Sequence, residues 1–404
     1  MVDISELLDG EWMTNIIRKV SQQHPSLDDM LKIRDQKQKV EFRGTLRPLY
    51  RELLETPPTG IEYRIYNPRY SILARRFWSK TWIPGKIIRH IYWRARYNPW
   101  LNGTLLHLSN YWDYSPIRMR RNFVADTENV GTFVSNWKFE DLRSPEIRRT
   151  IEDSIRSNFC RKIMPLTYAA KRTMEAVFNM EGLNDKIEVI YPAIRPLQID
   201  RRRRDNVVRI LFVGNNFLIK GGRELIEAFR IIKKRFDVEL TIVSQDAYDS
   251  MQPQKDVKIH ASTPRQELLS KFFPTADIFC LPTYADSFGF VFLEAKAAAL
   301  PIVSTTHFHV PEIVEDGETG LLVKAPISCW NRDFTYNYGW FNSLKNSHYP
   351  ETVSDLVDKL SILIEDDSMR IKMGDRGNKE VVEGKFSICA RNKKLKEIYE
   401  KANA

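Results

Sequence analysis

Two carboxylates eight positions apart are the residues of this chain with the clearest chemical use. Asp286 and Glu294 enclose a mostly apolar run. The segment 277–282, which is apolar after Asp277, precedes them. This pattern predicts a buried strand, a polar loop and then a helix that begins near Gly289. The start of a helix offers free backbone N–H groups and the positive end of its dipole, which together suit a phosphate. The two carboxylates would then hold hydroxyl groups at opposite ends of a ligand whose diphosphate lies between them, as a nucleotide-sugar site requires.

A lysine in a glycine-containing loop is the second feature with a chemical use. The run 207–213, apolar except for Arg209, is typical of a strand buried on both faces, and Gly214 ends it. Lys220 and Gly221 follow in the loop, before apolar residues recur at helical spacing. A lysine in this place can neutralise a diphosphate as a point charge, and glycine lets the backbone approach it closely. An ordinary turn with a solvated lysine is the alternative for this loop taken alone.

The segment from Asp277 to Val323 resembles the donor-binding signature of retaining glycosyltransferases of the GT-B architecture, family 4 group. The residues that match that signature are Asp286, Phe288, Gly289, Glu294, Ala295, Pro301, Pro311, Glu312, Gly317 and Gly320. Two positions depart from the pattern. The first acid of the family is usually Glu, so Asp286 reaches less far by one methylene. The loop ending at Lys220 resembles the family's Gly-Arg-x-x-x-x-Lys-Gly element, but Asn215 replaces the Arg and removes a bidentate phosphate donor.

The resemblance implies an α/β fold of the GT-B type, with two Rossmann-like doubly wound domains that face each other across a cleft. It further implies transfer of a sugar from a nucleotide diphosphate sugar to an acceptor hydroxyl, with retention at the anomeric carbon and with no metal ion or cofactor. The expected donor-binding residues are Gly214, Asn215, Lys220, Phe288, Gly289, Phe290 and Glu294, the last of them on the ribose. The expected catalytic residues are Asp286 on the sugar hydroxyls, Lys220 on the diphosphate and His107 near the sugar. Asp126 is a weaker catalytic candidate. His307 and His309 precede Pro311 and Glu312, close in sequence to the sugar-facing loop of the family, and are candidates for contact with the donor or the acceptor.

Two other functions fit the same fold. A non-catalytic protein that binds nucleotide sugars is favoured by the departures at Asp286 and Asn215. A nucleotide-sugar epimerase or hydrolase would use the same donor site for different chemistry. A requirement for an acceptor separates a transferase from the second alternative, and turnover of the donor separates it from the first.

The order of predicted elements sets the domain organisation. Strands and helices that alternate after residue 207 predict a parallel doubly wound sheet, whose ligands bind beyond the C-terminal ends of the strands. The strands expected in the two halves are 40–42, 104–108 and 122–125, then 207–213, 238–243, 257–260, 277–282 and 302–304, with helices at 46–54 and 264–273. We expect an acceptor-side domain at 1–198 that starts with an extra helical segment, a linker at 199–206, a donor domain at 207–385, and a final helix at 386–404 that packs back on the first domain. Residues 325–350 form an insertion that is a lid, a partner surface or a packed excursion.

Composition and charge bound the partners. The chain has 404 residues and a formal net charge of +10, and no apolar run is long enough to span a membrane. The first residues lack the apolar core of a signal peptide, and the four cysteines show no paired spacing, which together favour a reducing, cytoplasmic setting. Between residues 60 and 125, twelve Lys and Arg face two acidic residues, and aromatic residues are interleaved. This mixture is typical of peripheral docking on an anionic membrane at its inner face, where a lipid-linked acceptor would be found. A solvated basic surface is an equal alternative, and nucleic acid is the least favoured partner.

Overall fold

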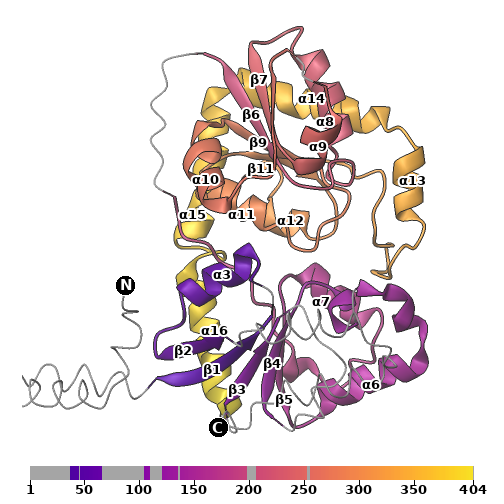
Figure 1. The fold of residues 1–404 in the computed structure, drawn as a ribbon, viewed down its shortest axis with the longest axis vertical. Coiled ribbons are helices and arrows are strands. Elements are labelled where there is room, and N and C mark those ends of the chain that lie inside the picture. Colours follow the sequence, from indigo (N-terminus) through magenta and orange to yellow (C-terminus); the bar gives the residue numbers. More distant parts are fainter. Residues whose placement is uncertain are drawn as a thin grey trace, which may run out of the picture.

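The protein folds into two α/β domains stacked along its longest axis, each built on its own parallel sheet (Figure 1). The computed structural model describes residues 37–44, 46–65, 104–109, 121–134, 137–197, 206–252 and 255–403. The helical segment predicted before residue 37, most of the basic and aromatic segment 60–125, and nearly all of the predicted linker 199–206 lie outside the described residues.

The first domain contains a five-stranded parallel sheet in the order β2-β1-β3-β4-β5. Its strands are β1 (Gln38–Arg43), β2 (Ile61–Ile65), β3 (Leu105–Leu108), β4 (Phe123–Thr127) and β5 (Cys160–Pro165). Among the described residues, the helices of this domain are α3 (Pro48–Glu55), α6 (Pro145–Arg156) and α7 (Tyr168–Glu175), with short 3-10 helices η3 (Val130–Phe133), η5 (Phe139–Arg143) and η6 (Asn184–Lys186). The predicted strands 40–42, 104–108 and 122–125 correspond to β1, β3 and β4, and the predicted helix 46–54 to α3.

The second domain contains a six-stranded parallel sheet in the order β11-β10-β9-β6-β7-β8. Its strands are β6 (Val208–Val213), β7 (Val238–Val243), β8 (Val257–His260), β9 (Ile278–Leu281), β10 (Ile302–Thr305) and β11 (Gly320–Val323). The chain runs from β6 outward through β7 and β8, then returns to β9 on the other side of β6. Open α/β sheets bind ligands outside the C-terminal ends of the strands at such a reversal of strand order, which here lies between β6 and β9.

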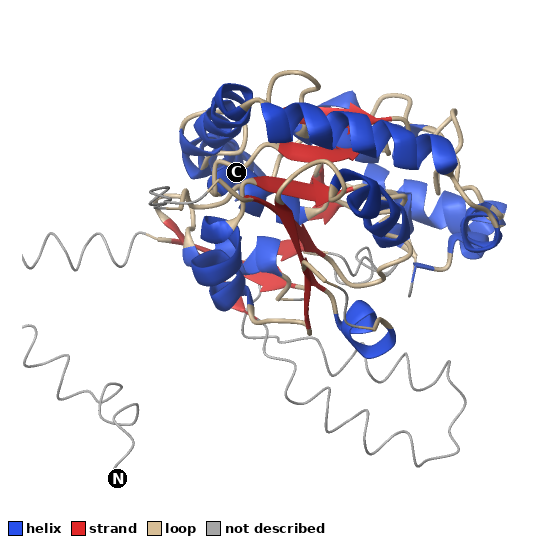
Figure 2. Cartoon of the chain, turned by 90° about the horizontal axis from the view of Figure 1, so that it is seen from above, coloured by secondary structure: helices blue, strands red, loops and turns tan. Residues whose placement is uncertain are grey.

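Helices cover both faces of the second sheet, as the views in Figures 1 and 2 show. They are α8 (Gly222–Ile232), α9 (Gln245–Ser250), α10 (Arg265–Glu267), α11 (Phe290–Ala297), α12 (Val310–Ile313), α14 (Pro350–Glu365) and α15 (Asp367–Val382). All four residues of β9 are buried, including Cys280, because neither face of a doubly wound sheet meets water. The continuous apolar runs of the sequence therefore correspond to strands, and the α/β fold class predicted from them is confirmed.

One predicted helix is irregular. The segment 264–273 was expected to form a single helix, but α10 has only three residues and continues as a π-helical turn (Leu268–Phe272) and a 3-10 turn (Phe273–Thr275). Pro274 has no N–H group and so cannot extend an α-helical hydrogen-bond ladder. The segment therefore ends in a π-helical turn, which is wider than an α-helical turn, and a 3-10 turn, which is tighter, immediately before β9.

The last helix, α16 (Ile388–Asn403), packs against β3 and β5 of the first domain (Figure 1). The amide of Gln38 donates a hydrogen bond of 2.9 Å to the Tyr399 carbonyl, and that of Asn122 donates one of 3.3 Å to the Ala402 carbonyl. The Arg391 guanidinium donates to the Thr56 carbonyl at 2.7 Å. The helix α16 thus packs on the first domain, although it follows the second domain in the sequence.

The insertion 325–350 connects the two domains on another side. The ring of Tyr336 stacks on that of Phe139 in η5, with centroids 3.9 Å apart and planes within 3°. The Tyr338 hydroxyl donates a hydrogen bond of 2.9 Å to the Phe139 carbonyl, and Arg143 lies 4.0 Å from the centre of the Tyr338 ring. The insertion then returns through α13 (Trp340–Asn346). Among the roles left open for it, the structure shows a packed excursion that holds the first domain.

Candidate functional site

Two loops meet at the C-terminal edge of the second sheet. One follows β6 and the other follows β9, and Gly221 allows them to touch. Gly221 has a φ of 73°, and a Cβ atom added there would lie 2.1 Å from the Pro282 carbonyl oxygen. Only glycine combines this backbone conformation with so close an approach. The sequence therefore places Lys220 directly beside the loop that carries Asp286.

Lys220 and Asp286 form an ion pair at this junction. The Lys220 Nζ lies 2.5 Å from Asp286 Oδ2 and also donates to the Ala285 carbonyl at 2.9 Å. Burial acts to raise the pKa of Asp286, but Lys220, His309 and the Ser287 N–H more than offset it and lower the pKa to about 2. Both side chains are mostly buried, so the pair is an ionised centre in a poorly solvated crevice.

The helix α11 begins next to this pair. Its N-cap, Gly289, has a φ of 66°, and a Cβ atom there would lie 2.7 Å from the Phe292 ring. The first N–H groups of a helix have no acceptor within the helix and carry the positive end of its dipole. The ammonium of Lys220 and the start of α11, from Phe288 to Phe290, consequently offer positive charge and hydrogen-bond donors around one space.

Glu294 lies inside α11 and is held by an arginine. The Arg265 Nε donates to Glu294 Oε1 at 2.6 Å, and the Arg265 Nη1 lies 3.3 Å from Oε2 of Glu52 in α3 of the first domain. Burial raises the pKa of Glu294, although Arg265 opposes this effect. Arg195 binds the other oxygen of Glu52 at 2.7 Å, so the chain Glu294–Arg265–Glu52–Arg195 joins the two domains beside the crevice.

The structure places Asn215 at the same edge, but its amide oxygen is already bonded. Asn215 Oδ1 accepts hydrogen bonds from the Gln245 N–H at 3.0 Å and from the Ser262 hydroxyl at 2.9 Å. It therefore ties the β6 loop to the loops after β7 and β8. Gly214 lies where a Cβ atom would be 3.3 Å from the Lys220 stem, so both residues support the loop that carries the lysine.

His107 and Asp126 lie together in the first domain. His107 Nε2 is 2.8 Å from Asp126 Oδ2, and its Nδ1 is 2.6 Å from the Tyr399 hydroxyl of α16, which in turn lies 2.8 Å from the Tyr63 hydroxyl. The His107 ring is fully buried, and both of its nitrogens are engaged in this network. The structure shows no contact between His107 and the Lys220–Asp286 pair in the described part of the chain. The catalytic role of His107 stays a prediction.

His307 and His309, which the sequence suggested as contacts of the donor or acceptor, lie close enough to Asp286 for their charges to interact with it. The ring of His309 is stacked against Phe288, with centroids 6.0 Å apart and planes within 12°, and it is fully buried. Burial lowers the pKa of His309 to about 4 and outweighs the nearby Asp286 charge, so the ring is neutral at physiological pH. His307 is bonded instead to the insertion, with Nδ1 3.2 Å from Ser328 Oγ.

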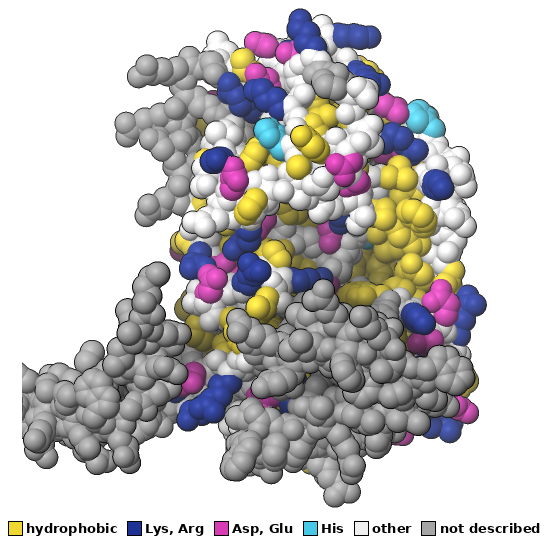
Figure 3. Space-filling model, in the orientation of Figure 1, with side chains coloured by type: hydrophobic (Ala, Val, Ile, Leu, Met, Phe, Trp, Pro, Cys, Tyr) yellow, Lys and Arg dark blue, Asp and Glu magenta, His cyan; other side chains and the backbone are white. Residues whose placement is uncertain are grey.

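Sequence reasoning did not find three charged residues of this region. Arg265 and Glu52 are 213 positions apart, so no spacing relates them. Arg47, at the start of α3, pairs with the buried Glu128. Burial lowers the pKa of Arg47, and the charge of Asp286 in the other domain partly opposes that effect. Charged side chains of both signs gather where the two domains meet (Figure 3).

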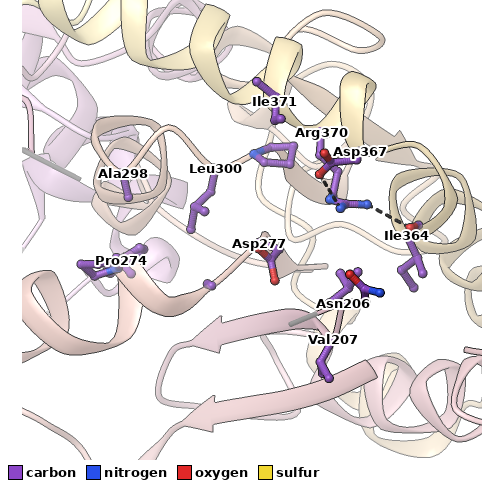
Figure 4. Close-up of a pocket in the computed structure, with 14 residues that line it drawn as sticks. Asn206, Val207, Pro274, Asp277, Ala298, Leu300, Ile364, Asp367, Arg370 and Ile371 are labelled. Carbon is purple, nitrogen blue, oxygen red and sulfur yellow. Dashed lines mark hydrogen bonds and ion pairs between the residues drawn. The ribbon is translucent and has the colours of Figure 1, made fainter. Parts of the chain in front are cut away.

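A cavity of about 460 Å³ lies elsewhere, at the N-terminal ends of β6 and β9 (Figure 4). Its charged lining residues are already paired: Asp367 binds Arg370 at 2.7 Å, and Asp277 accepts the Arg209 N–H at 2.7 Å. Parallel sheets bind ligands at the opposite edge, so this cavity is separate from the site described above. Among the described residues, no group of three or more His, Cys, Asp or Glu side chains is placed to hold a metal ion.

Comparison with known proteins gives matches that include the loops of Lys220 and Asp286 in the second domain. Residues 207–328 match the family model of glycosyl transferases group 1. The chain is 27% identical over 291 residues to a D-inositol 3-phosphate glycosyltransferase of Corynebacterium kroppenstedtii, a match that covers 65% of this chain and 58% of that protein. It is 28% identical over 202 residues to the capsular polysaccharide biosynthesis glycosyltransferase CapM of Staphylococcus aureus, covering 48% of this chain and 46% of that one.

Solved structures share the fold. Anabaena Alr3699/HepE in complex with UDP and glucose has a TM-score of 0.58 at 14% identity, over 90% of this chain and 99% of that one. WaaG, a glycosyltransferase involved in lipopolysaccharide biosynthesis, has a TM-score of 0.56 at 15% identity, over 89% and 99% of the two chains. The GT-B architecture and the resemblance to glycosyl transferases group 1 predicted from the sequence are therefore confirmed. Among the described helices, none combines the length and the apolar character that crossing a bilayer requires.

Proposed function

We propose that this protein is a glycosyltransferase that moves a sugar from a nucleotide diphosphate sugar to a hydroxyl group of a glycan or lipid-linked acceptor. The observation that carries the proposal is the meeting of Lys220 and Asp286, 2.5 Å apart, at the crevice where the sheet order reverses. The family model covers the same residues, and the two relatives described above are named as glycosyltransferases.

The leaving group of such a reaction is a nucleoside diphosphate, so the site must stabilise negative charge as the glycosidic bond breaks. Lys220 supplies a charge that reaches the β-phosphate, and the N–H groups from Phe288 to Phe290 supply donors at the start of α11. Asp286 stays ionised because its pKa is lowered to about 2, and it accepts hydrogen bonds from hydroxyls of the transferred sugar.

Glu294 would bind the ribose. Arg265 occupies Oε1 of Glu294 at 2.6 Å, which leaves Oε2 for a ribose hydroxyl. The same arginine contacts Glu52 of the first domain, so nucleotide binding is coupled to the contact between the domains. The guanidinium also lies 5.5 Å from the centre of the Phe290 ring, at the start of the same helix.

Retention at the anomeric carbon and independence of metal ions belong to the same proposal, on the strength of the sequence resemblance. A retained anomer in the product, read by NMR, tests the first. Turnover that survives a chelator such as EDTA tests the second. Peripheral docking on anionic membranes is proposed on the charge of residues 60–125, and flotation with anionic and neutral vesicles tests it.

The donor site is tested by thermal shift with UDP-, GDP- and ADP-sugars and their free diphosphates. Wild type, Glu294→Ala and Glu365→Ala are compared, the last being a control because Glu365 is exposed at the end of α14. A ligand at 100 times its Kd stabilises the native state by about 2.7 kcal/mol. We expect one nucleotide series to raise the Tm of wild type and control but not of Glu294→Ala. An equal rise in all three would remove Glu294 from the site, and no rise in wild type would refute a donor site.

Turnover distinguishes the transferase from the alternatives. A transferase releases nucleoside diphosphate in proportion to the acceptor supplied, whereas a hydrolase releases it without an acceptor. An epimerase converts the donor without releasing the diphosphate, and a non-catalytic binding protein leaves the donor intact. The UDP series is the first to assay, because HepE, which shares the fold, was solved with UDP and glucose.

A further inference from the structure

We propose that His309 binds the transferred sugar beside Asp286 and helps to determine which sugar the site accepts. The inference rests on the proposed function and goes beyond it, because it assigns a specificity-determining residue in the loop between β10 and α12. A hydroxyl-rich ring is the ligand class that the chemistry of this position fits.

The position of the ring supports this role. His309 is the residue before α12, and its imidazole is stacked on Phe288 with centroids 6.0 Å apart. Phe288 is the neighbour of Gly289, the N-cap of α11. The imidazole therefore lies against the start of α11, where the diphosphate would bind. The third loop of this edge of the sheet thus reaches the space between Asp286 and the start of α11.

The hydrogen bonding of His309 is incomplete. Its side chain is fully buried, and among the described residues neither Nδ1 nor Nε2 makes a well-formed hydrogen bond, although the Phe288 backbone lies close enough to act on the imidazole and raise its pKa. A buried polar atom without a partner is costly, and native proteins rarely retain one without a reason. In a neutral imidazole one nitrogen donates and the other accepts. Hydroxyl groups of a sugar both donate and accept, so they can satisfy the two nitrogens at once.

His307 provides the contrast. It is equally buried, but its Nδ1 lies 3.2 Å from Ser328 Oγ and its Nε2 lies 3.8 Å from Cys329 Sγ, both in the insertion. His307 therefore serves to hold the insertion against the loop. The two histidines are two positions apart, share the same burial and differ in partners, which makes His307 a matched control.

We assign His309 to the part of the site that would bind the sugar, and not to the part that would bind the nucleotide. The charges that act on His309 are those of Asp286 and Lys220, whereas those that act on Glu294 are Arg265 and Glu52. His309 accordingly belongs to the part of the crevice where the diphosphate meets the sugar. Burial keeps its imidazole neutral, so it offers an acceptor nitrogen as well as a donor to a hydroxyl.

The test separates the sugar from the nucleotide. Isothermal titration calorimetry on the full chain compares the free nucleoside diphosphate with its glucose, galactose and N-acetylglucosamine derivatives, for wild type, His309→Ala, His309→Asn and His307→Asn. We expect both His309 variants to bind the free diphosphate as wild type does, but to lose about tenfold affinity for the preferred nucleotide sugar and to change the ranking of sugars. His307→Asn should lower the Tm and preserve the ranking. Binding of the free diphosphate also shows that each variant is folded.

The calorimetry distinguishes a failure of the His309 inference from a failure of the proposed donor site. Unchanged ratios of nucleotide-sugar to diphosphate affinity in His309→Ala and His309→Asn would overturn the inference and leave the donor site standing. An equal loss for diphosphate and nucleotide sugar would overturn it too, because the residue would then act on the loop and not on the sugar. A wild-type protein that binds no nucleotide would refute the proposed function and the inference together.

Discussion

Replacing Lys220 by methionine isolates the ion pair at the centre of the crevice. Methionine keeps the volume of the lysine stem and removes the ammonium that lies 2.5 Å from Asp286 Oδ2. The Asp286 carboxylate then remains in a poorly solvated place without its cation. Removing one partner of a buried pair costs more than the pair itself contributes, because the other charge is left unpaired.

The structure gives the size of the effect and its dependence on pH. The pKa of Asp286 falls from 3.8 to about 2 although burial opposes the fall, which corresponds to about 2 kcal/mol of stability at neutral pH. A lowered carboxyl pKa contributes stability above the unfolded value of 3.8, and that contribution is lost as the pH falls toward 2. We therefore expect Lys220→Met to unfold about 2 kcal/mol more easily than wild type at pH 7, with a smaller difference at pH 3.

Urea unfolding at pH 7, 5 and 3, followed by tryptophan fluorescence and circular dichroism, measures the difference. Asp286→Asn and the double variant complete a cycle, and the double variant should be less destabilised than the sum of the single ones. Two results would refute the reasoning: equal stability of wild type and Lys220→Met at pH 7, or a difference at pH 3 as large as that at pH 7. Additive effects in the cycle would show that the two side chains act independently.

Two further predictions concern the backbone at α11 and the insertion. Gly289→Ala should lower the Tm and weaken donor binding, because the φ of Gly289 is 66° and the added Cβ would lie 2.7 Å from the Phe292 ring. Gly317→Ala is the control, since Gly317 has a φ of 78° but open space around it, and it should lower the Tm less. Equal losses of Tm in the two variants would contradict the steric argument. Tyr336→Ala should remove the stack that joins the insertion to the first domain, worth about 1 kcal/mol, and increase the radius of gyration in small-angle scattering. The exposed Phe341 in α13 gives the control Phe341→Ala, and an unchanged radius for Tyr336→Ala would show that the insertion does not restrain the domains.

The sequence predicted the elements of the second domain and part of its site. The strands around 207–213 and 277–282 were found because buried parallel strands read as continuous apolar runs. Asp286, Lys220 and Glu294 were proposed as site residues because they are charged residues that follow those apolar runs in the sequence. The helix 264–273 was predicted as regular, but it departs from α geometry at Leu268 and ends in a 3-10 turn that contains Pro274. The roles of these residues toward a donor stay predictions until ligands are tested.

The sequence by itself therefore determined what is local: the alternation of strands and helices, the loop with its lysine, and the acid pair around the start of α11. Tertiary structure alone decided which of these features meet. Lys220 and Asp286 are 66 positions apart and touch because β9 returns to the side of β6, and Arg265 reaches Glu52 because the two domains face each other. The same holds for the two histidines, which look alike in sequence. The insertion supplies partners for His307 and none for His309, and hydrogen-bond satisfaction is a property of the assembled neighbourhood that no local pattern encodes.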